Sequence, residues 1–166
     1  MIFVFWGVVA LLAAGVHLWR HKEPRTPERV PETFLRYWLL IALGIAGIVG
    51  GGFHLFDGPD TAQQIGFTNG DGGFQTEVGF ADIAVGVICM LAFWIRDPFW
   101  LAAIIAAAIS LWGDGYGHIH QEVVNNNHDP DNTGAVLYSD FIFPAVAAAL
   151  YVLYRRATPN PPPIRR

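Results

Sequence analysis

The chain has 166 residues and a formal net charge of −4, yet only 14% of its residues are charged while 53% are hydrophobic. Soluble domains carry about 25% charged residues, so this composition excludes an ordinary water-soluble fold. The single cysteine, Cys89, excludes a disulfide scaffold or a cysteine-rich zinc module. The lack of a basic tract outside short loops argues against nucleic acid as a partner.

Apolar stretches along the chain have the length of membrane-spanning helices, because a bilayer core needs about 20 apolar residues of helix. They cover residues 1–19, 35–56, 78–95, 98–120 and 136–154. The sequence therefore predicts an all-α integral membrane bundle of five transmembrane helices within one domain, residues 1–156. Asp97 and Pro98 are predicted as the N-cap and first residue of the fourth helix. The proline-rich segment 157–166 is predicted to form an extended cytoplasmic tail.

The basic residues are distributed on one side of this arrangement. With five spans, all 10 Lys and Arg residues fall on the same side, and the opposite loops, 57–77 and 113–135, contain none. The positive-inside rule then places the N-terminus outside and the C-terminus in the cytoplasm. Residues 1–19 lack a basic start and are followed by positive charges, which favours a retained anchor over a signal peptide. We therefore expect a multi-pass protein of the bacterial inner (cytoplasmic) membrane, with the lipid bilayer as its surroundings.

Ionisable side chains gather at one depth of the predicted bundle. Polar groups in hydrocarbon are costly, so each one should have a reason to be there. Counting about 1.5 Å per residue from the cytoplasmic ends places several of them in one outward-facing layer. Its members come from the second to the fifth span: His54, Glu77, Asp82, Asp114, His118 and Asp140.

This layer combines two imidazoles with several carboxylates, which are ligands of a divalent transition metal such as Zn²⁺, Fe²⁺, Mn²⁺ or Cu²⁺. Asp114 and His118 are four residues apart and share one helix face. Gln75 and Asp82 are seven apart and fall in line if the third helix begins early enough. The sequence predicts a metal site here, with a polar network without metal as the alternative. Whether the protein is an enzyme stays open; metal-assisted chemistry would have Glu77 or Asp82 as its base.

Other functions are weaker alternatives. His54 and His118 lie at similar depths, as the two axial ligands of a b-type haem would, but the nearby carboxylates do not suit an apolar macrocycle. Residues 129–140 have an EF-hand-like rhythm for calcium, with departures at Thr133 and Asp140. The chain could also be an accessory subunit of a larger respiratory or photosynthetic membrane complex. A small transporter is a third class, although the inner half lacks a matching series of ionisable groups.

Three runs of sequence carry a resemblance. They are GFQTEVGFADIAVG at 73–86, GDGYGHIHQ at 113–121, and NTG followed by YSDFIFP within 132–144. These runs resemble a group of short, uncharacterised bacterial polytopic inner-membrane proteins, and they cover the third to the fifth predicted span. The resemblance implies a polytopic inner-membrane protein and supplies no activity, because no catalytic signature defines that group.

Overall fold

The structure is a computed structural model that describes residues 2–66 and 72–158. Within those residues every element of regular secondary structure is a helix, as predicted. Residues 159–166, which make up most of the predicted tail, lie outside the described part. The elements in order are α1 (Ile2–Arg20), α2 (Arg29–Tyr37), a π-helical segment η1 (Trp38–Ile45), α3 (Ala46–Phe56), α4 (Gly58–Gln64), α5 (Gly72–Leu91), α6 (Phe99–Asn125), α7 (Pro130–Thr133) and α8 (Ala135–Ala157).

Four of the described helical stretches are long and apolar enough to cross a membrane. They are Arg29–Phe56, Gly73–Leu91, Phe99–Asn125 and Pro130–Ala157. In α1 the apolar stretch Val4–Arg20 is shorter, so a fifth span stays a prediction. Large apolar side chains are exposed on the outside of the bundle, including Leu12, Phe80, Ile109 and Leu153. Such a surface suits lipid rather than water, and indicates a membrane protein.

Helices α2 and α6 extend beyond the apolar stretches that predicted them, whereas α5 begins and ends earlier than the expected range of 78–95. The second span was expected to begin at residue 35, but α2 begins at Arg29, and α6 continues to Asn125 rather than ending near 120. Hydropathy marks the apolar part of a helix, whereas the polar turns at its ends are equally able to make backbone hydrogen bonds. The additional turns of α6 carry the chain beyond His118 and bring it to α7.

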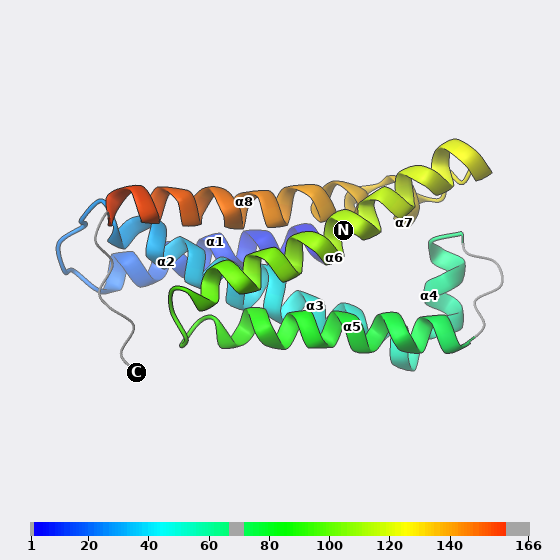
Figure 1. Cartoon of the computed structure of the whole chain (residues 1–166), viewed down its shortest axis with the longest axis horizontal. Helices are drawn as coiled ribbons and strands as arrows, with labels where there is room; N and C mark the ends of the chain where they lie inside the picture. The colour runs from blue at the N-terminus through cyan, green and yellow to red at the C-terminus, as the bar shows by residue number, and fades with distance from the viewer. Residues whose placement is uncertain (1, 67–71, 159–166) are drawn as a thin grey trace.

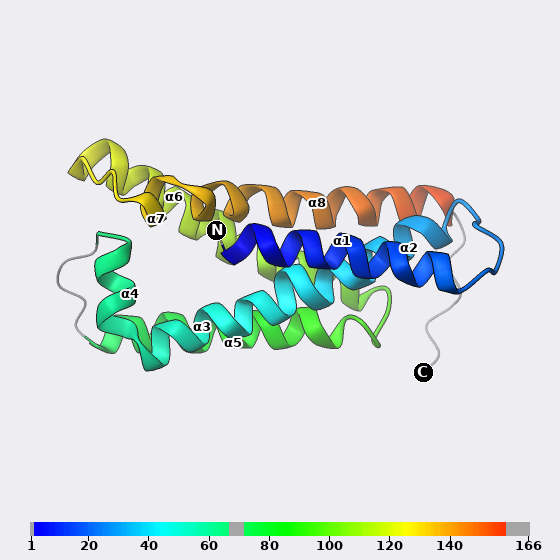
Figure 2. The same cartoon turned by 180° about the vertical axis from the view of Figure 1, so that it is seen from behind.

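The bundle has two different ends (Figures 1 and 2). The α1–α2 connection, the α5–α6 connection and the end of α8 lie at one end, and α4, the end of α6 and α7 lie at the other. We call these the basic end and the distal end. The described basic residues all belong to elements at the basic end: Arg20, Lys22, Arg25, Arg29, Arg36, Arg96, Arg155 and Arg156.

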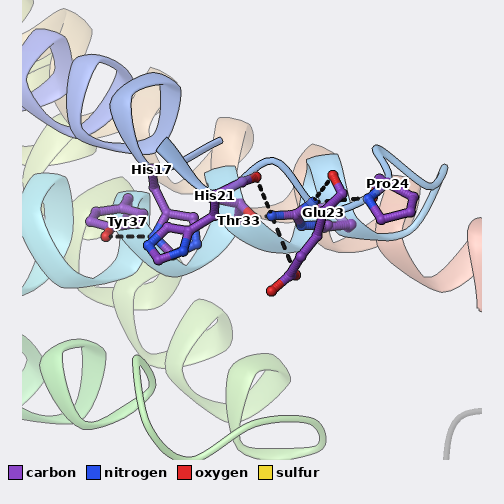
Figure 3. Close-up of polar contacts among 7 residues, drawn as sticks. His17, His21, Glu23, Pro24, Thr33 and Tyr37 are labelled. Atoms are coloured by element: carbon purple, nitrogen blue, oxygen red, sulfur yellow. Dashed lines mark hydrogen bonds and ion pairs between the residues drawn. The ribbon is translucent and has the colours of Figure 1, made fainter. Parts of the chain in front are cut away.

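Polar contacts hold the α1–α2 connection at the basic end (Figure 3). The Arg29 guanidinium donates to backbone carbonyls of the connection, including that of His21 at 2.9 Å, and forms an ion pair with Glu23 at 3.4 Å. His17 Nδ1 and the Tyr37 hydroxyl share a hydrogen bond at 3.2 Å. His17 is thereby engaged in joining α1 to α2.

Asp97 does not act as the predicted N-cap. Helix α6 begins at Phe99, and no side chain of the described chain caps its first turn. The Asp97 carboxylate instead accepts a hydrogen bond from the Tyr151 hydroxyl at 2.7 Å and forms an ion pair with Arg155. A nearby cation on α8 is a stronger partner for a carboxylate than a backbone N–H, and this competition explains the difference.

Glycines allow α3 and α5 to approach at backbone contact. A methyl group placed at Gly51 would lie 2.5 Å from the carbonyl oxygen of Gly79, and one at Gly79 would lie 2.8 Å from that of Gly51. Gly86 packs in the same way against Gly44 in η1. A methyl group placed at Gly86 would lie 2.8 Å from the carbonyl oxygen of Gly44. Small residues are how membrane helices pack closely. This contact sets the positions of His54 on α3 and Asp82 on α5.

The apolar core lies between the basic end and the middle of the bundle. Trp100 is fully buried and its indole N–H donates to the carbonyl of Ala92 at 2.6 Å, while Trp38 donates to the carbonyl of Phe143 at 2.9 Å. Other buried members of this cluster are Leu35, Leu39, Cys89, Ala103, Ala107, Ala147 and Tyr154. Toward the distal end most of the buried side chains are polar, namely Gln75, His118, Asn132, Ser139 and Asp140, and there the candidate site is found.

Candidate functional site

A histidine and an aspartate from neighbouring helices face each other near the distal end. His118 on α6 and Asp140 on α8 are both buried, with relative exposures of 9% and 6%. Their Nε2 and Oδ2 atoms are 3.7 Å apart, which is longer than a hydrogen bond. Asp140 Oδ2 is buried and has no hydrogen-bond partner among the described residues. A buried acceptor without a partner is costly, so this atom calls for an explanation.

Asn132 determines which nitrogen of His118 carries a proton. The fully buried Asn132 side chain donates from Nδ2 to two backbone carbonyls, those of His118 at 3.2 Å and Asn127 at 2.9 Å. Because these carbonyls only accept, the amide orientation is fixed and Oδ1 faces His118 Nδ1 at 2.8 Å. Nδ1 must therefore donate, and in the singly protonated form of the ring the lone pair lies on Nε2, toward Asp140.

A second set of the same kind lies between α3 and α5. His54 Nδ1 donates to Gln75 Oε1 at 2.6 Å, and His54 Nε2 lies 3.9 Å from Asp82 Oδ2. Gln75 is buried, while the His54 and Asp82 side chains are about one-fifth exposed, at 20% and 21%. Each set thus combines a side-chain amide, an imidazole and a carboxylate, and in both sets the histidine comes first along the chain, the amide second and the aspartate third.

Asp114 lies between the two sets in electrostatic terms. Its carboxylate on α6 interacts with the charges of Asp82, Asp140, His54 and His118. The Asp114 residue itself is exposed. Like-charged carboxylates in mutual range repel one another unless a cation or proton lies near them. Two facing pairs, His54–Asp82 and His118–Asp140, together with Asp114 within electrostatic range of both, make up what we call the cluster.

Glu77 does not join this cluster. Its side chain is exposed, and none of the ion pairs found in residues 2–66 and 72–158 includes it. The EF-hand-like segment, residues 129–140, is helical over Pro130–Thr133 and again from Ala135. Beyond Asp129, its oxygen-bearing side chains are therefore divided between two helices. Asn132 and Asp140 from that segment instead surround His118.

The cluster consists of pairs rather than one convergent centre. Across the described residues, no group of three or more His, Cys, Asp or Glu side chains is placed to hold a single metal ion. Metal binding therefore remains a prediction. Gln75 and Asn132, which set the imidazoles, were not among the predicted site residues. The seven-residue spacing of Gln75 and Asp82 is the sequence signal for Gln75, because α5 begins at Gly72 and includes both.

Comparisons with known proteins give a family without an activity. Neither a search of curated proteins nor a search of solved structures returned a match. A family model described as a family of unknown function matches residues 1–160. Because this match covers nearly the whole chain, the protein belongs to that family, DUF6790.

Proposed function

We propose that the distal end is an outward-facing binding site for a divalent transition metal ion in the bacterial inner membrane. Its ligands are the imidazoles and carboxylates of the cluster: His54, Asp82, Asp114, His118 and Asp140. One observation carries the proposal: His118 Nε2 and the unpartnered Asp140 Oδ2 face each other at 3.7 Å in a buried place.

With one ring proton, held on Nδ1 by Asn132, and with the Asp140 carboxyl ionised, both facing atoms are acceptors. A cation between them would satisfy both lone pairs. In a tetrahedral site with bonds of about 2.0–2.2 Å, neighbouring ligand atoms lie about 3.4 Å apart. The observed separations of 3.7 Å and 3.9 Å are close to that value. An imidazolium–carboxylate pair would instead support an N–H···O bond near 2.8 Å.

The surroundings of the imidazoles also support metal binding. Histidines that ligate metals almost always donate their other ring N–H to an acceptor that fixes the ring and its tautomer. Asn132 Oδ1 is such an acceptor for His118 Nδ1 at 2.8 Å, and Gln75 Oε1 is one for His54 Nδ1 at 2.6 Å. Nitrogen and oxygen donors without sulfur suit Zn²⁺, Fe²⁺, Mn²⁺ or Cu²⁺. Each pair supplies two ligands, and Asp114 would supply a further carboxylate.

The metal proposal is tested by a titration of metal-free protein with Co²⁺ in phosphatidylcholine nanodiscs. We expect stoichiometric binding, weakened about a hundredfold in His118→Gln. Structural zinc sites with four ligands bind with about 10–16 kcal/mol, so a single ligand contributes about 3 kcal/mol. His120→Gln is the matched control, because this exposed imidazole lies two residues along α6 on the opposite face. Absence of binding, or equal affinities in both variants, would refute the proposal and leave a structural polar layer, as expected of an accessory subunit.

We further propose that α1 is a fifth span, that its first residues are exported and that the distal end faces the outside. The support is the gathering of the described basic residues at the opposite end. Cys89 is fully buried, so a Cys89→Ala background can carry single new cysteines. In intact cells, a membrane-impermeant thiol reagent should label Gln64→Cys on α4, and should label Lys22→Cys only after permeabilisation. The reverse pattern would show the opposite orientation, and labelling of both would contradict the topology.

A further inference from the structure

We propose that Asn132 is the positioning residue of the His118 site, and that Asn127 makes this positioning depend on contact between the two halves of the distal end. This inference rests on the proposed metal site for its functional meaning. The geometry points to one hydrogen-bonded chain, which runs from the carbonyl of Ile65 through Asn127 and Asn132 to His118.

The first part of the chain is local to α6 and α7. Asn132 is the second residue after the proline that starts α7, and it is wholly enclosed there. One amide oxygen and both amide hydrogens are used, on His118 Nδ1, the His118 carbonyl and the Asn127 carbonyl. A side chain with every polar group satisfied is held rigidly. The His118 ring is therefore fixed in both tautomer and orientation from the side opposite Asp140.

The second part of the chain reaches the other half of the distal end. Asn127 Nδ2 donates to the carbonyl of Ile65 at 2.7 Å, and its Oδ1 accepts the Asp129 backbone N–H at 3.1 Å. Ile65 follows α4, in the segment between α3 and α5 that carry His54 and Asp82. Asn127 thus connects the two helix pairs through a single side chain.

Gly66 makes this docking specific. Its φ of +73° is in the left-handed region that favours glycine. A methyl group at Gly66 would lie 2.2 Å from Asp129 Oδ2 and 2.5 Å from Asn127 Oδ1. These two side chains occupy the space that any larger residue would need. The positive φ favours glycine at this position, and a larger residue would also require the side chains of Asn127 and Asp129 to move from the docked arrangement.

The consequence is that the His118 half of the site is fully ordered only when α4 is docked on the α6–α7 connection. The His54–Asp82 pair lies in one half of the distal end and the His118–Asp140 pair in the other. An ion bound by both pairs therefore needs the two halves at a fixed separation. The Asn127 contact sets that separation on the exported side. The hydrogen-bonded chain therefore links the position of the His118 ring to the docking of α4 on the α6–α7 connection.

The tautomer is measured directly by NMR of the metal-free, ¹⁵N-histidine-labelled full chain, with His118→Gln to identify the His118 signals. In the wild type we expect the proton on Nδ1. In Asn132→Leu we expect a mixture of tautomers and Co²⁺ binding weakened about tenfold to a hundredfold. Asn125→Leu is the matched control, because this exposed asparagine contacts Gln121 on its own helix and should leave both measurements unchanged.

The Gly66→Ala substitution tests the coupling while leaving the side chains of Asn127, Asn132 and His118 unchanged. It should also produce a mixture of His118 tautomers. A wild-type proton on Nε2 would overturn the inference without any variant, and so would an unchanged tautomer in a folded Asn132→Leu protein. An unchanged tautomer in Gly66→Ala would overturn the coupling. Failure of the wild type to bind Co²⁺ refutes the metal proposal alone, because the tautomer is read in metal-free protein.

Discussion

Replacing Asp140 with asparagine is expected to stabilise the metal-free protein while it weakens metal binding about a thousandfold. The two effects have one cause. Asp140 Oδ2 is a buried acceptor without a partner, and it faces the lone pair of His118 Nε2 at 3.7 Å. The asparagine amide has nearly the same shape and can place an N–H donor there. The new hydrogen bond from the asparagine amide to His118 Nε2 stabilises the metal-free protein, and the same bond occupies the lone pair that a metal ion would need.

The magnitudes follow from the same contact. Relief of an unsatisfied buried acceptor contributes about 1–3 kcal/mol to the stability of the metal-free protein. Loss of one charged ligand costs about 3 kcal/mol of binding energy. Breaking the new hydrogen bond on binding adds about 1 kcal/mol. The total of about 4 kcal/mol corresponds to about a thousandfold in affinity.

Thermal unfolding in nanodiscs with a chelator, followed by a Co²⁺ titration, measures both effects on one preparation. Asp60→Asn is the control, because this exposed aspartate on α4 should leave both quantities near the wild-type values. A lower unfolding temperature for metal-free Asp140→Asn would mean that the carboxylate supports the fold. In that case the facing acceptors are satisfied in some other way, and they do not require a cation between them.

Depth counting starts from the basic residues near which the helices begin and end at one end of the bundle. With that starting point, the constant rise per residue predicts a common layer for His54, Asp82, Asp114, His118 and Asp140, and the structure pairs His54 with Asp82 and His118 with Asp140. It gives no information about rotation about the helix axis. On α5 the rotation is set by the glycines that face α3.

Glu77 illustrates that limit. It lies two residues before Gly79, which turns it by about 200° from the packed face, whereas Asp82, three residues after Gly79, returns to within about 60° of it. Asp82 accordingly meets His54, and Glu77 is exposed. The glycines in 44–52 and 79–86 indicate where these helices pack closely. Which glycine of one helix meets which glycine of the other depends on how the two helices are aligned.

Asn132, the amide partner of His118, could not be predicted for a different reason. Asn132 belongs to a short polar segment that resembles a solvated loop, and its burial results from the extension of α6 and the return of the chain through α7. The fold class follows from hydropathy alone, because lipid requires helices with satisfied backbones. The identity of contacts in a polar layer depends on tertiary positions that no local pattern encodes.

Replacing Gly51 with alanine is expected to destabilise the protein by about 1–3 kcal/mol, whereas Gly52→Ala should be neutral or stabilising by up to about 1 kcal/mol. The added methyl group at Gly51 would lie 2.5 Å from the carbonyl oxygen of Gly79 and 2.8 Å from a side-chain carbon of Ile83. A backbone oxygen cannot move alone, so α3 and α5 must separate. At Gly52, no described atom lies within 4 Å of the added methyl group, so only its better helix propensity remains.

Unfolding in nanodiscs compares these adjacent alanine variants directly, and equal stabilities would contradict the close packing of α3 on α5. Separation of the helices also moves His54 away from Asp82, because each helix carries one of the two. Gly51→Ala should therefore lower stability and Co²⁺ affinity together, whereas Asp140→Asn should change them in opposite directions. This difference in sign separates the packing that positions the site from the chemistry of the site itself.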